Sequence, residues 1–429
     1  MRRDEHELLS ATSAGTPMGD FLRRYWTPVV LSTEIEADGA PVRVRIMGED
    51  LVAWRDTSGR PGLFGEFCSH RGASLYFAKN ADCGLRCWYH GWKYDVDGNC
   101  IDQPNEPPQT RFNDKVKQKA YPCVESAGAI WAYMGPPDKK PAFPELEWTL
   151  VPEANVHASK RFQECHWLQG LEGDLDSSHL SFLHGMEALS NSPRHQGAMG
   201  TSRFWIAGDT TPKMEVVQLP AGILQAARRE ADEKNHYYRI GQWFFPFFTT
   251  IPGHPGDTPF GGHAWVPVDD ENVWAFAFSW HPKRALKDDE LDFMHKGLSM
   301  HSLMQPGSWV PAHNKTNGYA APGSPPTKQP WQRIKLFQDQ DVAVTESIGA
   351  RYDRTKESLC STDLAILQMR RRLMAAARAM QEGEDPPGGN PKDYRKRPYS
   401  CLLPRDCPSW TEAVAEAIDA RPETWRPSI

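Results

Sequence analysis

Short runs of apolar and polar residues fill the first third of the chain. Residues 42–46 (VRVRI) alternate strictly, residues 51–54 and 129–133 are compact apolar runs, and turn residues such as 97–99 (DGN) separate them. A period of two places alternate side chains on opposite faces of a strand, and closely spaced turns join such strands into small sheets. The pattern predicts an all-β domain over residues 25–134.

The pattern changes at residues 135–141 (GPPDKKP), which are polar and rich in proline. Proline lacks an N–H group, so this stretch disfavours both a helix and a central strand, and we place a domain boundary there. Residues 167–184 read as a helix-like segment. Further strands are expected at residues 213–219, 237–248 and 273–280.

The closing third of the chain has helical spacing. Ser361, Thr362 and Asp363 are residues that cap helices, and the apolar positions after them suit a helix that runs to about Met380. A stretch rich in glycine and proline, residues 383–398, then ends it. Two unlike domains, the first all-β and the second mixed, are the simplest organisation.

The charge balance disfavours a nucleic-acid partner. The chain carries 49 Lys and Arg against 55 Asp and Glu, a formal charge of -6, whereas binding to phosphates needs basic surface. Its first residues (MRRDEHE) are charged and lead into no long apolar run, so we expect a cytoplasmic protein without membrane contact. Nine scattered cysteines argue against a disulfide framework and suit metal ligands better.

A first metal constellation stands in the all-β region. Cys68 and His70 belong to the run CSHRG, and Cys87 and His90 to the run CWYHGW, with sixteen residues between His70 and Cys87. Two loops that each supply one thiolate and one imidazole suit a [2Fe-2S] cluster with two Cys on one iron and two His on the other. Structural zinc is the alternative, but zinc fingers pair Cys with Cys and His with His.

A second constellation, DSSHLSFLH, begins at Asp176. On a helix Asp176 and His179 would lie one turn apart, whereas His184 would lie about 140° around from His179, so both rings reach one metal only if the helix distorts or ends. We expect it to end at Gly185.

Two histidines and one carboxylate form the facial triad of non-haem Fe(II) sites, which leaves open positions for O₂. Asp341, in the run FQDQDVAVTE, is our candidate for the carboxylate, and Asp339 is its rival.

The order Cys-x-His, sixteen residues, Cys-x-x-His resembles the Rieske motif of aromatic ring-hydroxylating oxygenases. The second constellation is similar to their mononuclear iron site, whose aspartate begins a helix five residues before a Glu, as Asp341 precedes Glu346. The likeness runs from residues 15–26 to the Asp341 helix and is strongest to the phthalate dioxygenase branch. Glu172 departs from it, since some relatives have Asn there.

The resemblance implies an α+β architecture. Residues 1–24 would form an N-terminal segment packing on the catalytic domain, and residues 25–134 the all-β Rieske [2Fe-2S] domain. Residues 135–429 would form a catalytic domain of antiparallel sheet and helices, of helix-grip type, with the mononuclear Fe(II).

The resemblance also implies a homotrimer in which one subunit's cluster lies near its neighbour's iron, with Asp176 bridging His90 and His179. The sequence holds neither a Gly-x-Gly-x-x-Gly loop nor a Cys-x₄-Cys-x₂-Cys run. We therefore expect electrons from NADH to arrive through a separate reductase of the flavin and ferredoxin type.

The aromatic run of residues 236–248 is a candidate substrate wall. Strand alternation places Arg239 and Trp243 on one face, and Arg239 could pair with a carboxylate, although a core strand whose arginine reaches solvent also fits. Arg203 is a second candidate.

Ring cis-dihydroxylation of a phthalate-like compound and O-demethylation of a methoxylated aromatic acid both suit the same iron. A Rieske electron-transfer protein without oxygenase chemistry is the alternative, and it leaves His179, His184 and Asp341 without a purpose.

Overall fold

A computed structural model describes residues 1–184, 198–253, 256–327 and 329–428. The chain folds into two compact units. The N-terminal unit holds residues 12–141 and 267–269, and the C-terminal unit holds residues 1–11, 142–266 and 270–429. No helix among the described residues is long and apolar enough to cross a membrane.

The first 24 residues do not act as one segment. Helix α1 (Arg3–Ser10) belongs to the C-terminal unit, where Arg3 pairs with Asp353 at 3.3 Å. Helix α2 (Pro17–Leu22) belongs to the N-terminal unit, where the buried Arg23 side chain donates to backbone carbonyls of that unit. The expected N-terminal segment is therefore divided after residue 11.

The N-terminal unit consists of short antiparallel strands. Three sheets form, and in spatial order they hold β1 (Trp26–Leu31), β11 (Ala129–Tyr133) and β10 (Cys123–Ser126); β2 (Val42–Ile46), β3 (Glu49–Arg55), β4 (Pro61–Gly65) and β9 (Ala120–Tyr121); β5 (Lys79–Ala81), β6 (Gly84–Arg86), β7 (Lys93–Tyr94) and β8 (Cys100–Asp102). Strand β2 shows why alternation predicts a strand, since Val44 and Ile46 are buried while Arg43 and Arg45 are exposed.

The C-terminal unit is built on one eight-stranded antiparallel sheet. In spatial order its strands are β12 (Val156–Gln163), β18 (Val273–Trp280), β17 (Phe260–Pro267), β16 (Phe248–Ile251), β15 (Asn235–Phe244), β14 (Gly222–Glu230) and β13 (Lys213–Leu219), and β19 (Tyr399–Pro404) also pairs with β15.

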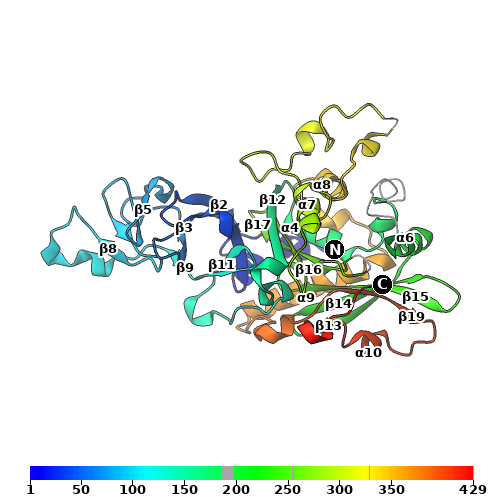
Figure 1. Cartoon of the computed structure of the whole chain (residues 1–429). Helices are drawn as coiled ribbons and strands as arrows, with labels where there is room; N and C mark the ends of the chain where they lie inside the picture. Colours follow the sequence, from blue (N-terminus) through cyan, green and yellow to red (C-terminus); the bar gives the residue numbers. More distant parts are fainter. Residues whose placement is uncertain (185–197, 254–255, 328, 429) are drawn as a thin grey trace. The chain divides into compact units, whose positions relative to one another are not determined.

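Helices surround this sheet (Figure 1). Helix α4 (Trp167–Leu175) packs on β16, α8 (Phe337–Ser347) packs on α4, and α9 (Leu364–Gln381) packs on α4, β13 and β14. The remaining α-helices of this unit are α3 (Glu147–Leu150), α6 (Ala198–Gly208), α7 (Asp288–His295) and α10 (Trp410–Val414). The predicted α+β fold, an all-β domain followed by an antiparallel sheet with helices, is confirmed.

One predicted element is wrong in its length. The helix expected over residues 167–184 ends at Leu175, because Asp176 adopts an extended backbone with ψ of 117°. The Asp176 carboxylate accepts hydrogen bonds from the Ser178 N–H and hydroxyl, both at 2.7 Å, and this local turn competes with the helix. His179 and His184 are therefore not held by one regular helix, and Gly185 lies outside the described residues.

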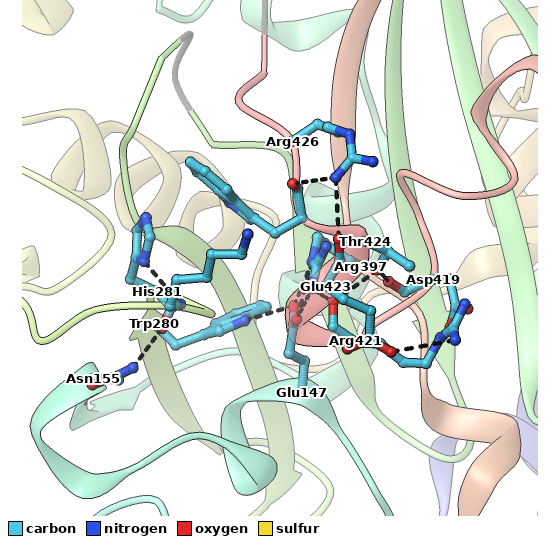
Figure 2. Close-up of polar contacts among 12 residues, drawn as sticks. Glu147, Asn155, Trp280, His281, Arg397, Asp419, Arg421, Glu423, Thr424 and Arg426 are labelled. Atoms are coloured by element: carbon cyan, nitrogen blue, oxygen red, sulfur yellow. Dashed lines mark hydrogen bonds and ion pairs between the residues drawn. The ribbon is translucent and has the colours of Figure 1, made fainter.

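A buried ion pair fixes the C-terminal segment to the sheet (Figure 2). Arg397, on the segment before β19, is fully buried and donates through two nitrogens to the Glu147 carboxylate of α3. The Trp280 indole N–H of β18 donates to the same carboxylate at 3.0 Å. Because a buried charge is costly without a partner, these bonds hold three distant parts of the sequence together.

Candidate metal centres and substrate cavity

Two similar loops of the N-terminal unit present the first ligand set. In each loop the cysteine N–H, of Cys68 or Cys87, donates at 2.8 Å to the carbonyl five residues later. The N–H of the glycine four residues later, Gly72 or Gly91, donates back to the cysteine carbonyl at 2.9 and 3.0 Å. Both glycines have positive φ angles, of 73° and 78°, a conformation that other residues rarely adopt. The backbone alone therefore gives both loops the same tight shape.

The four predicted cluster ligands lie together in these loops. The Cys68 and Cys87 side chains share a hydrogen bond, which lowers the pKa of Cys68 to about 6 and raises that of Cys87. The imidazoles of His70 and His90 meet edge to face, with ring centres 4.5 Å apart. Burial, and then the neighbouring His90, lower the pKa of His70 and keep its ring neutral. Two sulfur and two neutral imidazole donors in one place fit a [2Fe-2S] cluster.

Neighbouring side chains fix the orientation of these ligands. The Tyr94 hydroxyl lies 3.2 Å from the Cys68 sulfur and 3.0 Å from the Ser69 hydroxyl. The His70 ring stacks on Trp92 with centres 4.3 Å apart. Hydrogen bonds to ligand sulfurs adjust the reduction potential of such a cluster, so Tyr94 is placed to do so.

The second ligand set lies in the C-terminal unit. Ligand atoms of His179, His184 and Asp341 all lie within 4.8 Å of one another, and no other group of this kind is found among the described residues. The distance from an Asp341 carboxylate oxygen to Nε2 is 3.1 Å for His184 and 3.8 Å for His179. Two imidazoles and one carboxylate in this arrangement fit a mononuclear Fe(II).

The hydrogen bonding of His184 supports a metal at this point. Its Nδ1 lies 2.9 Å from the side-chain oxygen of Gln340, so Nδ1 carries the proton and donates to it. Nε2 is buried and has no hydrogen-bond partner among the described residues. A metal ion would satisfy this nitrogen. Sequence reasoning missed Gln340, although its place directly before Asp341 was a signal.

The structure separates the two candidate aspartates. Asp339 and Asp341 are two residues apart on α8, which places them roughly 200° apart around the helix. Asp341 therefore turns toward His179 and His184, whereas Asp339 is buried with its carboxylate 2.5 Å from Nδ1 of His313. Asp339 connects α8 to the loop of His313 and lies away from the ligand set.

Asp176 lies beside the ligand His179. One carboxylate oxygen accepts the two bonds from Ser178, and the other lies 3.5 Å from Nδ1 of His179. Burial raises the pKa of Asp176, but the hydrogen bonds from His179 and Ser178 outweigh it and lower the pKa to about 2. Asp176 is therefore ionised and accepts a proton from either neighbour in a hydrogen bond.

A buried arginine holds this turn against the sheet. The Arg229 guanidinium of β14 donates to the Ser177 hydroxyl at 3.0 Å and to the Ser177 carbonyl at 2.5 Å. Its Nε donates to the Asp209 carbonyl at 3.1 Å. No sequence pattern marked Arg229, because its partners come from other parts of the chain.

A cavity of about 680 Å³ opens beside the iron ligands. His179 and Asp341 line it, together with aliphatic residues such as Leu180, Leu183 and Ile348. Its volume is within the range of small-molecule sites, which are mostly apolar with a few placed polar groups.

The predicted substrate residues have different places. Arg239 is half-buried in the cavity wall, and no ion-pair partner is found for it among the described residues. Trp243 is fully buried, donates to the Pro246 carbonyl at 3.2 Å and is not among the lining residues. The Arg203 side chain lies outside the described part of the structure.

The remaining charged groups of the cavity wall are balanced. Arg370 pairs with Glu172 at 2.7 Å and with both oxygens of Glu357. The buried Arg354 lies 3.8 Å from Glu172. Glu172, the position that departs from the family pattern, is thus one of two acids opposite two arginines. Arg239 is left as a cation without a matching acid in this part of the described wall.

Comparisons with known proteins cover nearly the whole chain. Residues 25–122 match the Rieske [2Fe-2S] domain, and residues 132–421 match the "LigXa C-terminal domain like" family. The chain is 34% identical to the oxygenase subunit of 3-chlorobenzoate-3,4-dioxygenase from Comamonas testosteroni, over 97% of this chain and 98% of that protein. It is 36% identical to the oxygenase subunit of phthalate 4,5-dioxygenase from Pseudomonas putida, over 97% and 95%.

A further relative carries out a different reaction. The oxygenase subunit of 5,5'-dehydrodivanillate O-demethylase from a Sphingobium species is 31% identical over 89% of this chain and 82% of that protein. Among solved structures, dicamba monooxygenase bound to 3,6-dichlorosalicylic acid has the same fold, with a TM-score of 0.60 and 17% identity over 85% of this chain and all of the other.

The matches extend beyond the cluster domain to the unit that holds the second ligand set, so an electron carrier without its own chemistry is not favoured. The chain therefore belongs to the Rieske non-haem iron oxygenases, as an oxygenase component that takes one [2Fe-2S] cluster and one mononuclear iron.

Proposed function

We propose that this oxygenase hydroxylates an aromatic carboxylate. The observation that carries the proposal is Arg239, a cation without an acidic partner among the described residues, in the wall of the cavity that His179 and Asp341 also line. A guanidinium in a partly dry cavity binds a carboxylate through two parallel hydrogen bonds. The names of the chlorobenzoate and phthalate dioxygenases support an acidic aromatic substrate.

The protein's own groups then divide the work. Arg239 holds the carboxylate, while the aliphatic side chains of the cavity wall pack on the ring and keep water away from it. His179, His184 and Asp341 would hold the iron, and the four cluster ligands would hold the [2Fe-2S] group. When bound, the cluster supplies single electrons and the iron supplies O₂ activation.

We propose the same partners as the sequence suggested. The protein would form a homotrimer and receive electrons from NADH through a separate flavin- and ferredoxin-type reductase, and we place the reaction in the cytoplasm, where NADH is available. Asp176 would bridge His179 to His90 of a neighbouring subunit. Its ionised carboxylate, with one oxygen directed at His179, supports this role.

Two outcomes of hydroxylation are compatible with this cavity. Ring cis-dihydroxylation leaves both oxygen atoms on the substrate, whereas O-demethylation hydroxylates a methoxy carbon, which leaves as formaldehyde. The iron ligands serve both equally, because the outcome depends on which substrate carbon Arg239 directs toward the metal. The dioxygenase names favour dihydroxylation, and the O-demethylase name keeps the second outcome as a candidate.

Turnover by the reconstituted holoenzyme tests the proposal. We expect substrate-dependent O₂ uptake with 3-chlorobenzoate, phthalate or 5,5'-dehydrodivanillate, with a diol or formaldehyde identified as product. An Arg239→Met variant should raise KM for the acid by about tenfold to a hundredfold, since a hydrogen bond to a charged group contributes about 1.5–3 kcal/mol. Equal KM values in the variant and the parent protein would show that Arg239 does not bind the acid.

A further inference from the structure

The two strands that carry Arg239 also carry a second polar side chain of the cavity. Strands β14 and β15 are antiparallel, with Ala227 opposite Arg239 and Gln225 opposite Gly241. Residues two apart on a strand share a face, and cross-strand partners share it too, so all four belong to one face. All four residues also line the cavity.

The small residues of this group leave room for the large ones. Gln225 and Arg239 are diagonal neighbours, at a spacing that long side chains can bridge. Ala227 and Gly241 occupy the other two positions and place no bulky side chain between them. A Cβ atom at Gly241 would lie 3.7 Å from the side-chain nitrogen of Gln225, so this amide lies above the glycine. Both polar heads thus approach the same part of the cavity.

The Gln225 amide has no hydrogen-bond partner in residues 1–184, 198–253, 256–327 and 329–428. The side chain is only 7% exposed, and its oxygen is both buried and unpartnered. A buried amide without a hydrogen bond is unfavourable, so such groups are normally paired. Gln169, another glutamine of this cavity wall, follows the rule and donates to the carbonyls of Thr345 and Gly349. Gln225 is the exception that a ligand would correct.

The chemistry of the pair favours an anionic oxygen as that ligand. Arg239 offers only N–H donors, and the Gln225 nitrogen that lies over Gly241 is a donor as well. Donors that converge from two sides suit a carboxylate, whose two oxygens offer about four acceptor positions. Arg239 can take two of these, and one remains within reach of the amide.

We propose that Gln225 is a specificity-determining residue, which donates a hydrogen bond from its side-chain nitrogen to the substrate carboxylate held by Arg239. This inference rests on the proposed function, because it requires an acidic substrate. Gln225 adds a geometric requirement that Arg239 alone does not impose: the carboxylate must lie over the β14–β15 pair, which fixes the direction in which the ring extends toward the iron.

Charge reversal at constant size tests the inference. In the holoenzyme, Gln225→Glu places a carboxylate where the substrate carboxylate should bind, and we expect the Kd for 3-chlorobenzoate or phthalate to rise about thirtyfold or more. Gln225→Leu removes the donor without adding charge, and we expect a rise of about tenfold. The neutral compound 3-chlorobenzamide should bind the parent protein and both variants within a factor of about three, since it carries no charge for the new acid to repel.

Matched variants separate the possible failures. Gln218→Glu makes the same change at an exposed position on β13, and it should leave all three Kd values unchanged. If Arg239→Met weakens binding of the acids but both Gln225 variants bind them like the parent protein, the role of Gln225 is wrong and the proposed function stands. If Arg239→Met has no effect either, the acidic-substrate proposal fails. Retained cluster absorption and iron content show that each variant is folded.

Discussion

The two metal centres are built in opposite ways. The cluster ligands come from two short loops, and each loop is shaped by its own backbone hydrogen bonds and one glycine with positive φ. The iron ligands come from the turn after α4 and from α8, and they are oriented by Gln340, Asp176 and Arg229. A site made of local loops can be recognised from a sequence motif, whereas a site assembled from distant elements depends on contacts that no local pattern records.

The largest expected effect concerns Asp176, where the proposal joins both centres. An Asp176→Asn variant keeps the size of the side chain but loses the negative charge that faces His179. We expect turnover to fall at least a hundredfold, about the contribution of a positioned acid–base group. Iron analysis should still find about three irons per chain, and the visible spectrum of the cluster should not change.

Full activity of Asp176→Asn with both metals bound would reject the role. A loss of iron would also contradict it, because Asp176 would then only orient His179. Ser178→Ala is the matched control, since it removes one bond to the other carboxylate oxygen and keeps the charge. Its turnover should stay within about threefold of the parent protein.

A smaller effect is expected where the iron site depends on a distant contact. Gln340→Leu removes the acceptor of the His184 Nδ1–H bond and leaves His184, His179 and Asp341 in place. Loss of such a supporting bond typically costs about 10-fold to 100-fold in metal affinity. Iron retention in a series of chelator concentrations measures this, with the cluster spectrum as an internal control.

Unchanged iron affinity in Gln340→Leu would mean that α8 alone sets the orientation of His184. The difference between the two centres would then be smaller than the contacts suggest. Asp339→Asn is a useful companion, because it alters the neighbouring carboxylate, which is bonded to His313. That variant should keep its iron.

This difference also explains which parts of the molecule sequence reasoning could reach. Strands β2, β11, β13 and β18 have the bounds that the apolar pattern predicts, because alternation or a short apolar run is itself the physical cause of a buried strand. The helix before His179 was predicted too long, because helical spacing does not reveal the turn that the Asp176 carboxylate makes with Ser178.

Long-range pairing was the second limit. Arg239 and Trp243 share a strand face, yet only Arg239 lines the cavity, since Trp243 packs against the cis Phe245-Pro246 turn. Nothing in the run of residues 236–248 distinguishes the two. The partner of Glu172, Arg370, lies on a helix far along the chain and was likewise beyond any local pattern.

The smallest expected effect tests the cluster side of the comparison. Tyr94→Phe removes the hydroxyl 3.2 Å from the Cys68 sulfur, and the ring can stay in place because it is fully buried. A hydrogen bond donated to a ligand sulfur stabilises the reduced cluster, which carries more electron density, so its loss should lower the reduction potential. With a differential strength of about 1 kcal/mol, the shift of this one-electron couple is about 40 mV. Redox titration followed by visible absorption measures it. Ser69→Ala removes the hydroxyl group that bonds to Tyr94 and should shift the potential less, in either direction. A potential that does not move in Tyr94→Phe would show that the loop backbone alone sets the cluster environment, and the cluster centre would then be still more local than the iron centre.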